Sequence, residues 1–503
     1  MGRQLLRGSG VNLLDHLVKI AVAFYMAPMM LRTLAAEGYG SWLLAMNVIS
    51  FFMLLDLGLS FASMRSYAVA VGSGDRGQEG TVLAVSRKLF QMVGLAILIC
   101  TVAAIPFMPW LTAWDPASGA VMGALAICGT TTALRFFWRM PMVLLRAHVR
   151  YDLLAWCSIT RSIFQVILMT ILLQSGLGLW GAALAHGCGD CLELALQNLM
   201  ARRLPCQPRA SLPPDATERT RRDLMSYSGS VMLVNLGEAF RLQVNPFLIS
   251  RMFGVSQVPI YSIGMRLITM LEDVVNALFG GQILASFSQL HGAEEHEALR
   301  EQFRRVTRIT VGFSAWAVGG MAFFGEAFFK RWMGEDFGRA HEVMLILALP
   351  YGLRFMQYPA HSLLYTLNRQ KWLVWSNFIG GIVTVVFALL LAPVFGLEGV
   401  VLGTALEMSA FYLLVMPFLL RECAGIRPLS YLFRSILLPG LATLALPSVF
   451  AVWALTWLTP DYGELLLCGL GYGLAFALTA PWLTLDAGMR RTLIMILRKG
   501  SAS

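Results

Sequence analysis

The chain has 503 residues, of which 57% are hydrophobic and only 14% charged, and its formal net charge is +10. A soluble domain carries about 25% charged residues, so this composition excludes a soluble globular protein. The apolar residues form blocks of roughly 20 residues or more, long enough to cross about 30 Å of hydrocarbon as helices. We therefore predict an all-α polytopic membrane protein.

The first apolar block contains Asp15, His16 and Lys19, and no small-residue cleavage site follows it. We interpret it as a membrane span and not as a signal peptide. In chain order the apolar blocks predict about fourteen transmembrane helices, near residues 9–31, 39–64, 88–110, 119–145, 153–175, 178–200, 225–250, 257–287, 307–329, 341–366, 372–394, 397–420, 433–458 and 463–485.

Orientation follows from the Lys and Arg residues of the connecting segments. With the N-terminus inside, most of the 39 Lys and Arg residues fall in inner segments, and few fall in outer loops, as Arg32 and Arg251 do. This bias predicts that both termini are cytoplasmic. It also accounts for the positive net charge, so we expect no nucleic-acid partner.

An internal repeat recurs at a spacing of 219 residues. Residues 134–156 and 353–375 align without gaps and share Arg135/Arg354 and Trp156/Trp375. The repeat unit contains an even number of spans, so both copies enter the membrane from the same side, as in a two-lobed transporter with parallel repeats. We predict two six-helix lobes, a linker and an extra helix pair: N-lobe 1–202, cytoplasmic linker 203–224, C-lobe 225–430, and C-terminal helix pair with tail 431–503.

Two six-helix lobes followed by two further helices resemble the polysaccharide-transport branch of the multidrug/oligosaccharidyl-lipid/polysaccharide (MOP) flippase superfamily. The stretch 28–59, PMMLRTLAAEGYGSWLLAMNVISFFMLLDLGL, resembles the first helix pair of bacterial O-antigen and exopolysaccharide repeat-unit flippases. The resemblance implies a MATE-like fold in the bacterial inner membrane. It also implies translocation of undecaprenyl-pyrophosphate-linked oligosaccharide to the periplasmic leaflet by alternating access, alongside the polysaccharide polymerase and glycosyltransferases of the same pathway.

Charged residues inside spans are costly and mark functional sites. In the fourth span Arg135, Arg139 and Arg146 stand at i, i+4 and i+11, within about 40° of one another on an ideal helix. The repeat places an arginine and aromatic or imidazole rings on the matching face of the tenth span, at Arg354, Tyr358, His361 and Tyr365. Further cations at membrane depth are Lys19, Arg161, Arg241 and Arg266.

This basic and aromatic interior suits an anionic, sugar-bearing substrate, because arginine binds phosphate oxygens bidentately. The alternative is structural pairing: Asp15 with Lys19 and Glu238 with Arg241 are spaced as helical ion pairs, and Arg146 could snorkel to the interface. Arg135 and Arg139 either line a cavity or pair locally, and no acid shares their face of the helix.

Acidic residues inside spans are candidates for coupling to H⁺ or Na⁺, namely Asp15, Asp56, Asp190, Glu193, Glu238 and Glu407. His186, Asp190 and Glu193 run along one helical face, either as a proton relay or as a buried anchor. Pro28, Pro141, Pro246 and Pro359 lie at repeat-equivalent positions and should bend their helices.

The chain has no Walker motif, no HExxH and no long loop for catalytic residues, so we expect a transporter without cofactors and not an enzyme. Its expected partners are the lipid-linked oligosaccharide and membrane lipids. Within the same superfamily a peptidoglycan lipid-precursor flippase and a multidrug/cation antiporter remain alternatives. A membrane-embedded polysaccharide polymerase or ligase is the alternative from another class.

Overall fold

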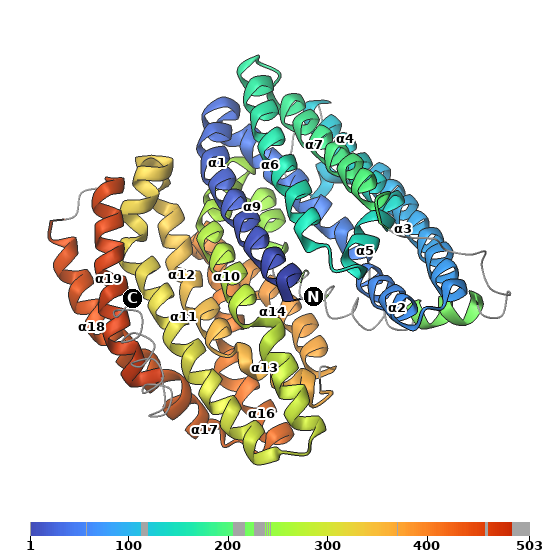
Figure 1. The fold of residues 1–503 in the computed structure, drawn as a ribbon. Coiled ribbons are helices and arrows are strands. Elements are labelled where there is room, and N and C mark those ends of the chain that lie inside the picture. The colour runs from blue at the N-terminus through green and yellow to red at the C-terminus, as the bar shows by residue number, and fades with distance from the viewer. Residues whose placement is uncertain are drawn as a thin grey trace, which may run out of the picture. The chain divides into compact units, whose positions relative to one another are not determined.

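The computed structural model describes residues 2–56, 58–111, 119–204, 217–225, 237, 239, 241, 243–369, 371–457 and 461–484. These residues form helices and turns and contain no β-strand, which confirms the all-α prediction (Figure 1). The chain divides into two compact units, Met1–Pro259 and Ile260–Ser503. Of the predicted linker 203–224, residues 205–216 lie outside the described part, and the predicted domain limits stay predictions.

The first unit combines helices long enough to cross a membrane with several shorter ones. They are α1 (Gly2–Met53), η1 (Leu54–Asp56), α2 (Leu59–Ser73), α3 (Arg76–Leu111), α4 (Gly119–Phe137), α5 (Met140–Ala147), α6 (Tyr151–Gln174), α7 (Gly178–Ala201), α9 (Asn245–Phe253) and η2 (Val255–Gln257). Within this unit α4 packs against α3 and α7, and α6 packs against α1 and α7.

The second unit begins within α10 and continues to the last described helix. Its elements are α10 (Val258–Gly292), α11 (His296–Met333), η3 (Glu335–Phe337), α12 (Gly338–Met356), α13 (Tyr358–Thr366), α14 (Lys371–Phe395), α15 (Leu397–Ala410), the π-helical turn η4 (Phe411–Val415), α16 (Met416–Ala424), α17 (Pro428–Ser430), the π-helical turn η5 (Tyr431–Leu437), α18 (Leu438–Leu455) and α19 (Tyr462–Thr484). The C-terminal helices α18 and α19 pack against each other and against α11.

The backbone repeats the spacing found in the sequence. Helices α4 and α12 begin and end 219 residues apart, at Gly119–Phe137 and Gly338–Met356. Ala35 and Gly254 are related by the same offset, and both have a positive φ. Helix α1 has a break at Ala35 with φ 57°, and α9 ends at Gly254 with φ 91°. The offset also joins the positive φ of Val149 to that of Asn368. The two copies therefore share helix bounds and turn geometry.

The predicted fourth and tenth spans, 119–145 and 341–366, are each two helices and not one. Helix α4 ends at Phe137 and α5 starts at Met140, while α12 ends at Met356 and α13 starts at Tyr358. Pro141 and Pro359 occupy the first turns of α5 and α13. A proline ring collides with the carbonyl of the preceding helical turn and has no N–H to donate, so the expected bend becomes a full break.

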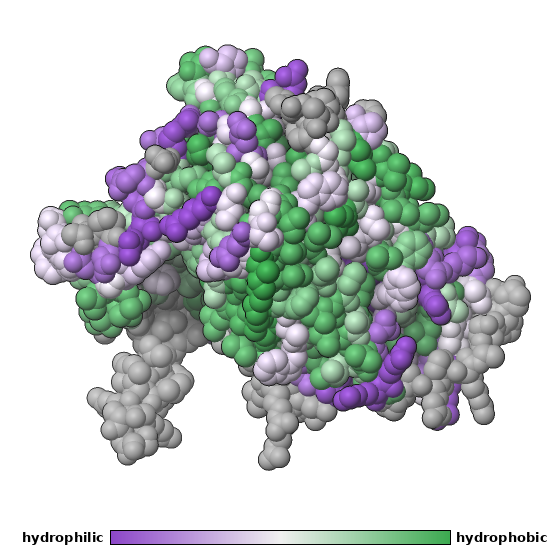
Figure 2. Space-filling model, turned by 90° about the horizontal axis from the view of Figure 1, so that it is seen from above, coloured by the Kyte–Doolittle hydropathy of each residue, from purple (hydrophilic) through white to green (hydrophobic). Residues whose placement is uncertain are grey.

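Nine helices within the described ranges are long and apolar enough to cross a membrane. One of these segments, Leu14–Ser73, has 60 residues and covers the predicted span 39–64 and most of the predicted span 9–31. Figure 2 shows hydrophobic residues over broad areas of the visible surface. Exposed leucines and valines on α18 and α19, such as Leu441, Val449 and Leu474, are suited to contact with lipid tails.

Close packing of the helices depends on small residues. This is usual in membrane proteins, because the hydrophobic effect does not drive helices together in lipid. Helix α15 lies so near α14 that a Cβ built on Gly403 would stand 2.6 Å from the backbone nitrogen of Ala388. By contrast, a Cβ on Gly469 of α19 would meet nothing within 4 Å. These two glycines form a matched pair for testing the packing.

We expect Gly403→Ala to destabilise the protein by about 1–3 kcal/mol, because the added methyl group must displace backbone. The control Gly469→Ala should be neutral or stabilise by up to about 1 kcal/mol through helix propensity. Thermal unfolding of both variants in detergent measures the difference. Equal unfolding temperatures would contradict the described contact between α14 and α15.

Candidate functional site

A cavity of about 400 Å³ lies inside the first unit, between α1, α2, α4, α5, α6 and α7. Its charged lining consists of four cationic and two anionic side chains, Lys19, Arg135, Arg139, Arg146, Asp15 and Glu193. Polar and aromatic groups such as Ser158, Gln197 and Tyr151 also face it. The predicted stripe of three arginines therefore opens into one space, although the break between α4 and α5 interrupts the helix that carries it.

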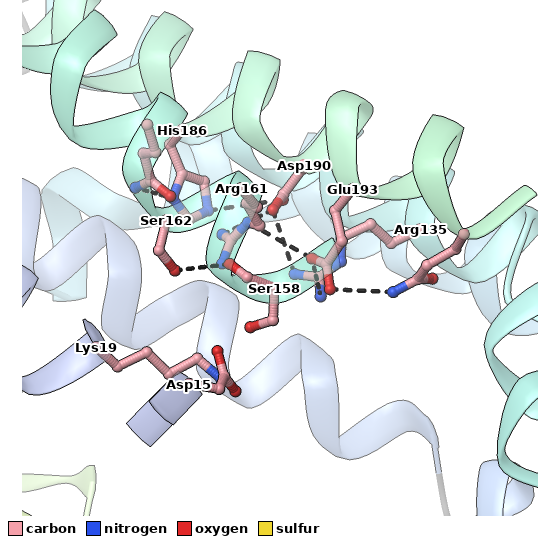
Figure 3. Close-up of polar contacts among 11 residues, drawn as sticks. Asp15, Lys19, Arg135, Ser158, Arg161, Ser162, His186, Asp190 and Glu193 are labelled. Atoms are coloured by element: carbon pink, nitrogen blue, oxygen red, sulfur yellow. Dashed lines mark hydrogen bonds and ion pairs between the residues drawn. The ribbon is translucent and has the colours of Figure 1, made fainter. Parts of the chain in front are cut away.

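Two arginines and two carboxylates form a buried ion cluster beside this cavity, which we define as Arg135, Arg161, Asp190 and Glu193 (Figure 3). Arg135 of α4 contacts Asp190 at 3.3 Å and Glu193 at 3.4 Å. Arg161 of α6 contacts the same two carboxylates at 2.8 and 3.5 Å. The cluster thus ties α4 and α6 to α7.

The charges within the ion cluster balance. Asp190 is fully buried, and a buried carboxylate is tolerated only when cations and hydrogen bonds replace its water. Gln197 donates a hydrogen bond to Glu193 at 3.0 Å. His186 lies 3.7 Å from Asp190, and its other ring nitrogen lies 3.3 Å from the Gln165 amide. The structure therefore gives Arg135 acid partners on a neighbouring helix, which inspection of its own helix face could not reveal.

Arg139 stands in the break between α4 and α5 and has a different environment. Its Nε donates to the Ser60 hydroxyl at 3.3 Å, and that hydroxyl donates to Asp56 at 2.8 Å. The guanidinium also lies 4.9 Å from the centre of the Phe136 ring, in the range of a cation–π contact. Asp56 is thus connected to Arg139 through a neutral hydroxyl and makes no direct ion pair with it within the described residues.

The remaining cationic lining residues differ in how far their charge is compensated. Lys19 forms the predicted helical pair with Asp15, at 2.7 Å. Arg146 is exposed, and within the described residues no carboxylate lies within ion-pair distance of it. Positive charge that neighbouring acids leave uncancelled is therefore concentrated at Arg139 and Arg146.

Arg150 lies just outside the cavity, before α6, and is fully paired. Its Nε donates to Asp152 at 3.0 Å and its terminal nitrogen donates to the same carboxylate at 3.2 Å. This hydrogen bonding raises the pKa of Arg150 above its ordinary value. Arg150 is thus a nearby arginine that does not line the cavity.

In the second unit the predicted residues also have partners. Arg354 pairs with Glu272 of α10 at 2.8 Å, and its guanidinium lies 5.9 Å from the Tyr351 ring centre. The His361 ring nitrogen lies 3.2 Å from the Tyr412 hydroxyl. Tyr358 begins α13 and is partly buried, while Tyr365 is exposed.

The other predicted residues are scattered. Glu407 is buried in α15, Arg241 is buried in the first unit, and Arg266 is exposed on α10. Glu238 lies outside the described residues, so its predicted pair with Arg241 is not described. Sequence reasoning missed Ser60, Gln197 and Glu272 as partners, although Glu272 lies within a predicted span and could have been included on that ground.

Among the described residues, no group of three His, Cys, Asp or Glu side chains could hold a metal ion. The lining of the cavity is chemically complementary to an anion: it has guanidinium groups with unused donors, hydroxyl groups and an aromatic ring. Guanidinium groups bind the oxygens of phosphate groups through parallel hydrogen bonds.

Comparison with known proteins identifies the family and the fold. The family model for polysaccharide biosynthesis proteins matches residues 5–291. An uncharacterized membrane protein, EpsK, of Bacillus subtilis (strain 168) is 22% identical over 428 residues, covering 82% of each chain.

Solved structures with the same fold belong to transporters. An inward-facing multidrug resistance MATE transporter of the MOP superfamily superposes with a TM-score of 0.66 at 13% identity, covering 82% of this chain and 98% of that one. A point mutant of the Vibrio cholerae MATE transporter VcmN gives 0.59 at 17% identity, covering 84% and 97%. A MOP-superfamily transporter of Pyrococcus furiosus, described as having a binding pocket of reverse polarity, gives 0.58 at 14% identity, covering 82% and 94%. The chain belongs to the polysaccharide biosynthesis protein family and has the MATE-like fold of the MOP transporter superfamily.

Proposed function

We propose that this protein is a flippase for undecaprenyl-pyrophosphate-linked oligosaccharide. It moves the repeat unit from the cytoplasmic to the periplasmic leaflet of the bacterial inner membrane by alternating access, with both termini cytoplasmic. The pathway's polymerase and glycosyltransferases would act on the same lipid-linked units. The family and the fold support a MOP transporter, and the charge of the cavity supports this class of substrate.

The observation that carries the proposal is the uncompensated positive charge at Arg139 and Arg146. The four charges of the ion cluster balance, and Lys19 is paired with Asp15, so these residues hold the wall together. Arg139 and Arg146 line the same cavity with their donors largely unused. In an environment of low dielectric constant, cations without an acid partner are stabilised strongly by binding an anionic group such as a pyrophosphate.

A carrier of cationic drugs would require an acidic or apolar cavity, so the excess of arginine argues against a multidrug/cation antiporter. A flippase for the peptidoglycan lipid precursor would recognise the same pyrophosphate and differs only in the sugar. The proposed polysaccharide substrate follows the family description for residues 5–291. Transport assays with both lipids distinguish the two.

The contacts of each candidate carboxylate determine which should be tested first for coupling to H⁺ or Na⁺. Asp190 and Glu193 belong to the ion cluster and Asp15 to a helical pair, which favours structural roles for all three. Asp56 accepts a hydrogen bond from Ser60, whose hydroxyl also contacts the cavity residue Arg139. We therefore propose Asp56 as the first carboxylate to test for coupling, ahead of Glu407 and Glu238.

We expect Arg139→Gln and Arg146→Gln each to reduce flipping of a fluorescent undecaprenyl-pyrophosphate oligosaccharide in proteoliposomes by roughly 10- to 100-fold, since a hydrogen bond to a charged group contributes about 1.5–3 kcal/mol. The matched control Arg150→Gln, outside the cavity, should keep near-normal transport. If both cavity variants transport like the wild type at equal reconstitution, the substrate does not bind there.

The ion cluster predicts a different response. Asp190→Asn and Arg161→Gln should each lower the free energy of unfolding by about 3 kcal/mol, because each leaves a buried charge uncompensated. The double variant restores the charge balance and should be more stable than the sum of the single losses by about 1 kcal/mol or more. Thermal unfolding in detergent measures this cycle.

The same variants test whether Asp190 serves transport and not structure. Loss of transport by Asp190→Asn at unchanged unfolding temperature would contradict the structural assignment. It would place Asp190 among the coupling groups.

A further inference from the structure

A second hollow lies on the other side of the break between α4 and α5. This groove, of about 640 Å³, is formed by α3, α5, the end of α7 and the break itself. Two neighbouring residues of the break face different spaces: Arg139 lines the cavity of the first unit, and Trp138 lines the groove. Both spaces therefore border the same break between α4 and α5. None of the cavity's six charged residues lines this groove, which is therefore a separate site.

The groove combines an apolar floor with a cationic rim. Leu83, Phe137, Met140 and Leu144 provide apolar surface, and Arg87 and Arg202 provide the charge. Both arginines are exposed, and within the described part of the chain neither has a carboxylate within ion-pair distance. None of the residues that line the groove is acidic. Its charge is therefore complementary to an anion with an apolar body.

Trp138 marks the depth of the groove in the membrane. The residue is 50% exposed and directly follows the end of the candidate span Gly119–Phe137. Tryptophan is enriched where the hydrocarbon meets the headgroups, since one end of the ring is apolar and the other donates a hydrogen bond. The distribution of Lys and Arg assigns Arg87 and Arg202 to the cytoplasmic side. We therefore expect these residues to lie at the headgroup level of the cytoplasmic leaflet.

The second copy of the repeat has different residues at the positions of Trp138 and Arg87. The gapless repeat places Gln357 opposite Trp138, and Gln357 is fully buried and donates to the Tyr412 carbonyl at 2.8 Å. The same offset places the apolar Val306 opposite Arg87. In that copy the break is closed by the protein itself. The second copy does have a hollow at equivalent positions, since Leu299, Phe303 and Leu363 lie 219 residues after the groove residues Gly80, Ala84 and Leu144. Neither Gln357 nor Val306 lines that hollow, whereas their counterparts Trp138 and Arg87 both line the groove of the first copy.

We propose that the groove binds the phosphodiester headgroup of an anionic membrane phospholipid, with Arg87 and Arg202 on the phosphate and the acyl chains along the apolar floor. Basic pockets between helices on the cytoplasmic side suit such headgroups. A lipid held here contacts the break that carries Arg139, so lipid composition would influence the cavity of the first unit from outside it.

The test is native mass spectrometry of the full chain in detergent, titrated with phosphatidylglycerol or with phosphatidylcholine of the same acyl chains. Wild type should retain phosphatidylglycerol in preference to phosphatidylcholine. Arg87→Gln and Arg202→Gln should each weaken this binding about fivefold, and Lys88→Gln, an exposed neighbour that does not line the groove, should leave it unchanged.

Three results would overturn the proposal. Equal retention of the two lipids by the wild type would show that the groove binds acyl chains and does not distinguish the charge of the headgroup. Unchanged binding by the Arg87→Gln/Arg202→Gln double variant, at a wild-type unfolding temperature, would place the lipid elsewhere. Displacement of phosphatidylglycerol by substoichiometric undecaprenyl phosphate would assign the groove to the substrate lipid.

Discussion

Two carboxylates on one membrane helix determine how the first unit is arranged. Asp190 and Glu193 stand on α7 away from bulk water, where unpaired charges are very costly. Arg135 from α4 and Arg161 from α6 each contact both of them. Because both arginines must reach both acids, the three helices can separate only by exposing charge to hydrocarbon. This constraint fixes one wall of the cavity.

The ion pairs in that wall determine which arginines keep a charge that can attract a substrate. Since Arg135 and Arg161 neutralise the acids, they have little charge left to attract a substrate. Arg139, only one helical turn from Arg135 in the sequence, lies past the end of α4 and is held by a serine hydroxyl and an aromatic ring. The break after Phe137 thus separates a structural arginine from one that can bind a ligand.

The sequence predicted the membrane class, the repeat and a stripe of arginines on one helical face because each depends on local composition or on spacing. Arg135, Arg139 and Arg146 could be placed on one side by helical periodicity alone. The partners could not be predicted, since Asp190 and Glu193 lie 55 and 58 residues from Arg135. Their contact depends on how α4 packs against α7, which no local pattern contains. The full break at the prolines was likewise predicted only as a bend.

The two copies of the repeat share backbone geometry and differ in what stands at the break. Three consecutive residues of the first copy, Phe137, Trp138 and Arg139, correspond to Met356, Gln357 and Tyr358 in the second. Gln357 satisfies a carbonyl of the π-helical turn η4, so its break is sealed by an internal hydrogen bond.

In the first copy Trp138 is exposed and Arg139 lines the cavity of the first unit. A polar group sealed in the interior keeps a helix break in one geometry, because moving it would leave a buried donor unsatisfied. In the first copy no buried amide seals the break: Trp138 is exposed, and Arg139 is held by the Ser60 hydroxyl at the edge of the cavity. The first copy is therefore the one whose break is open to a ligand, and the cations beside it are complementary to an anion.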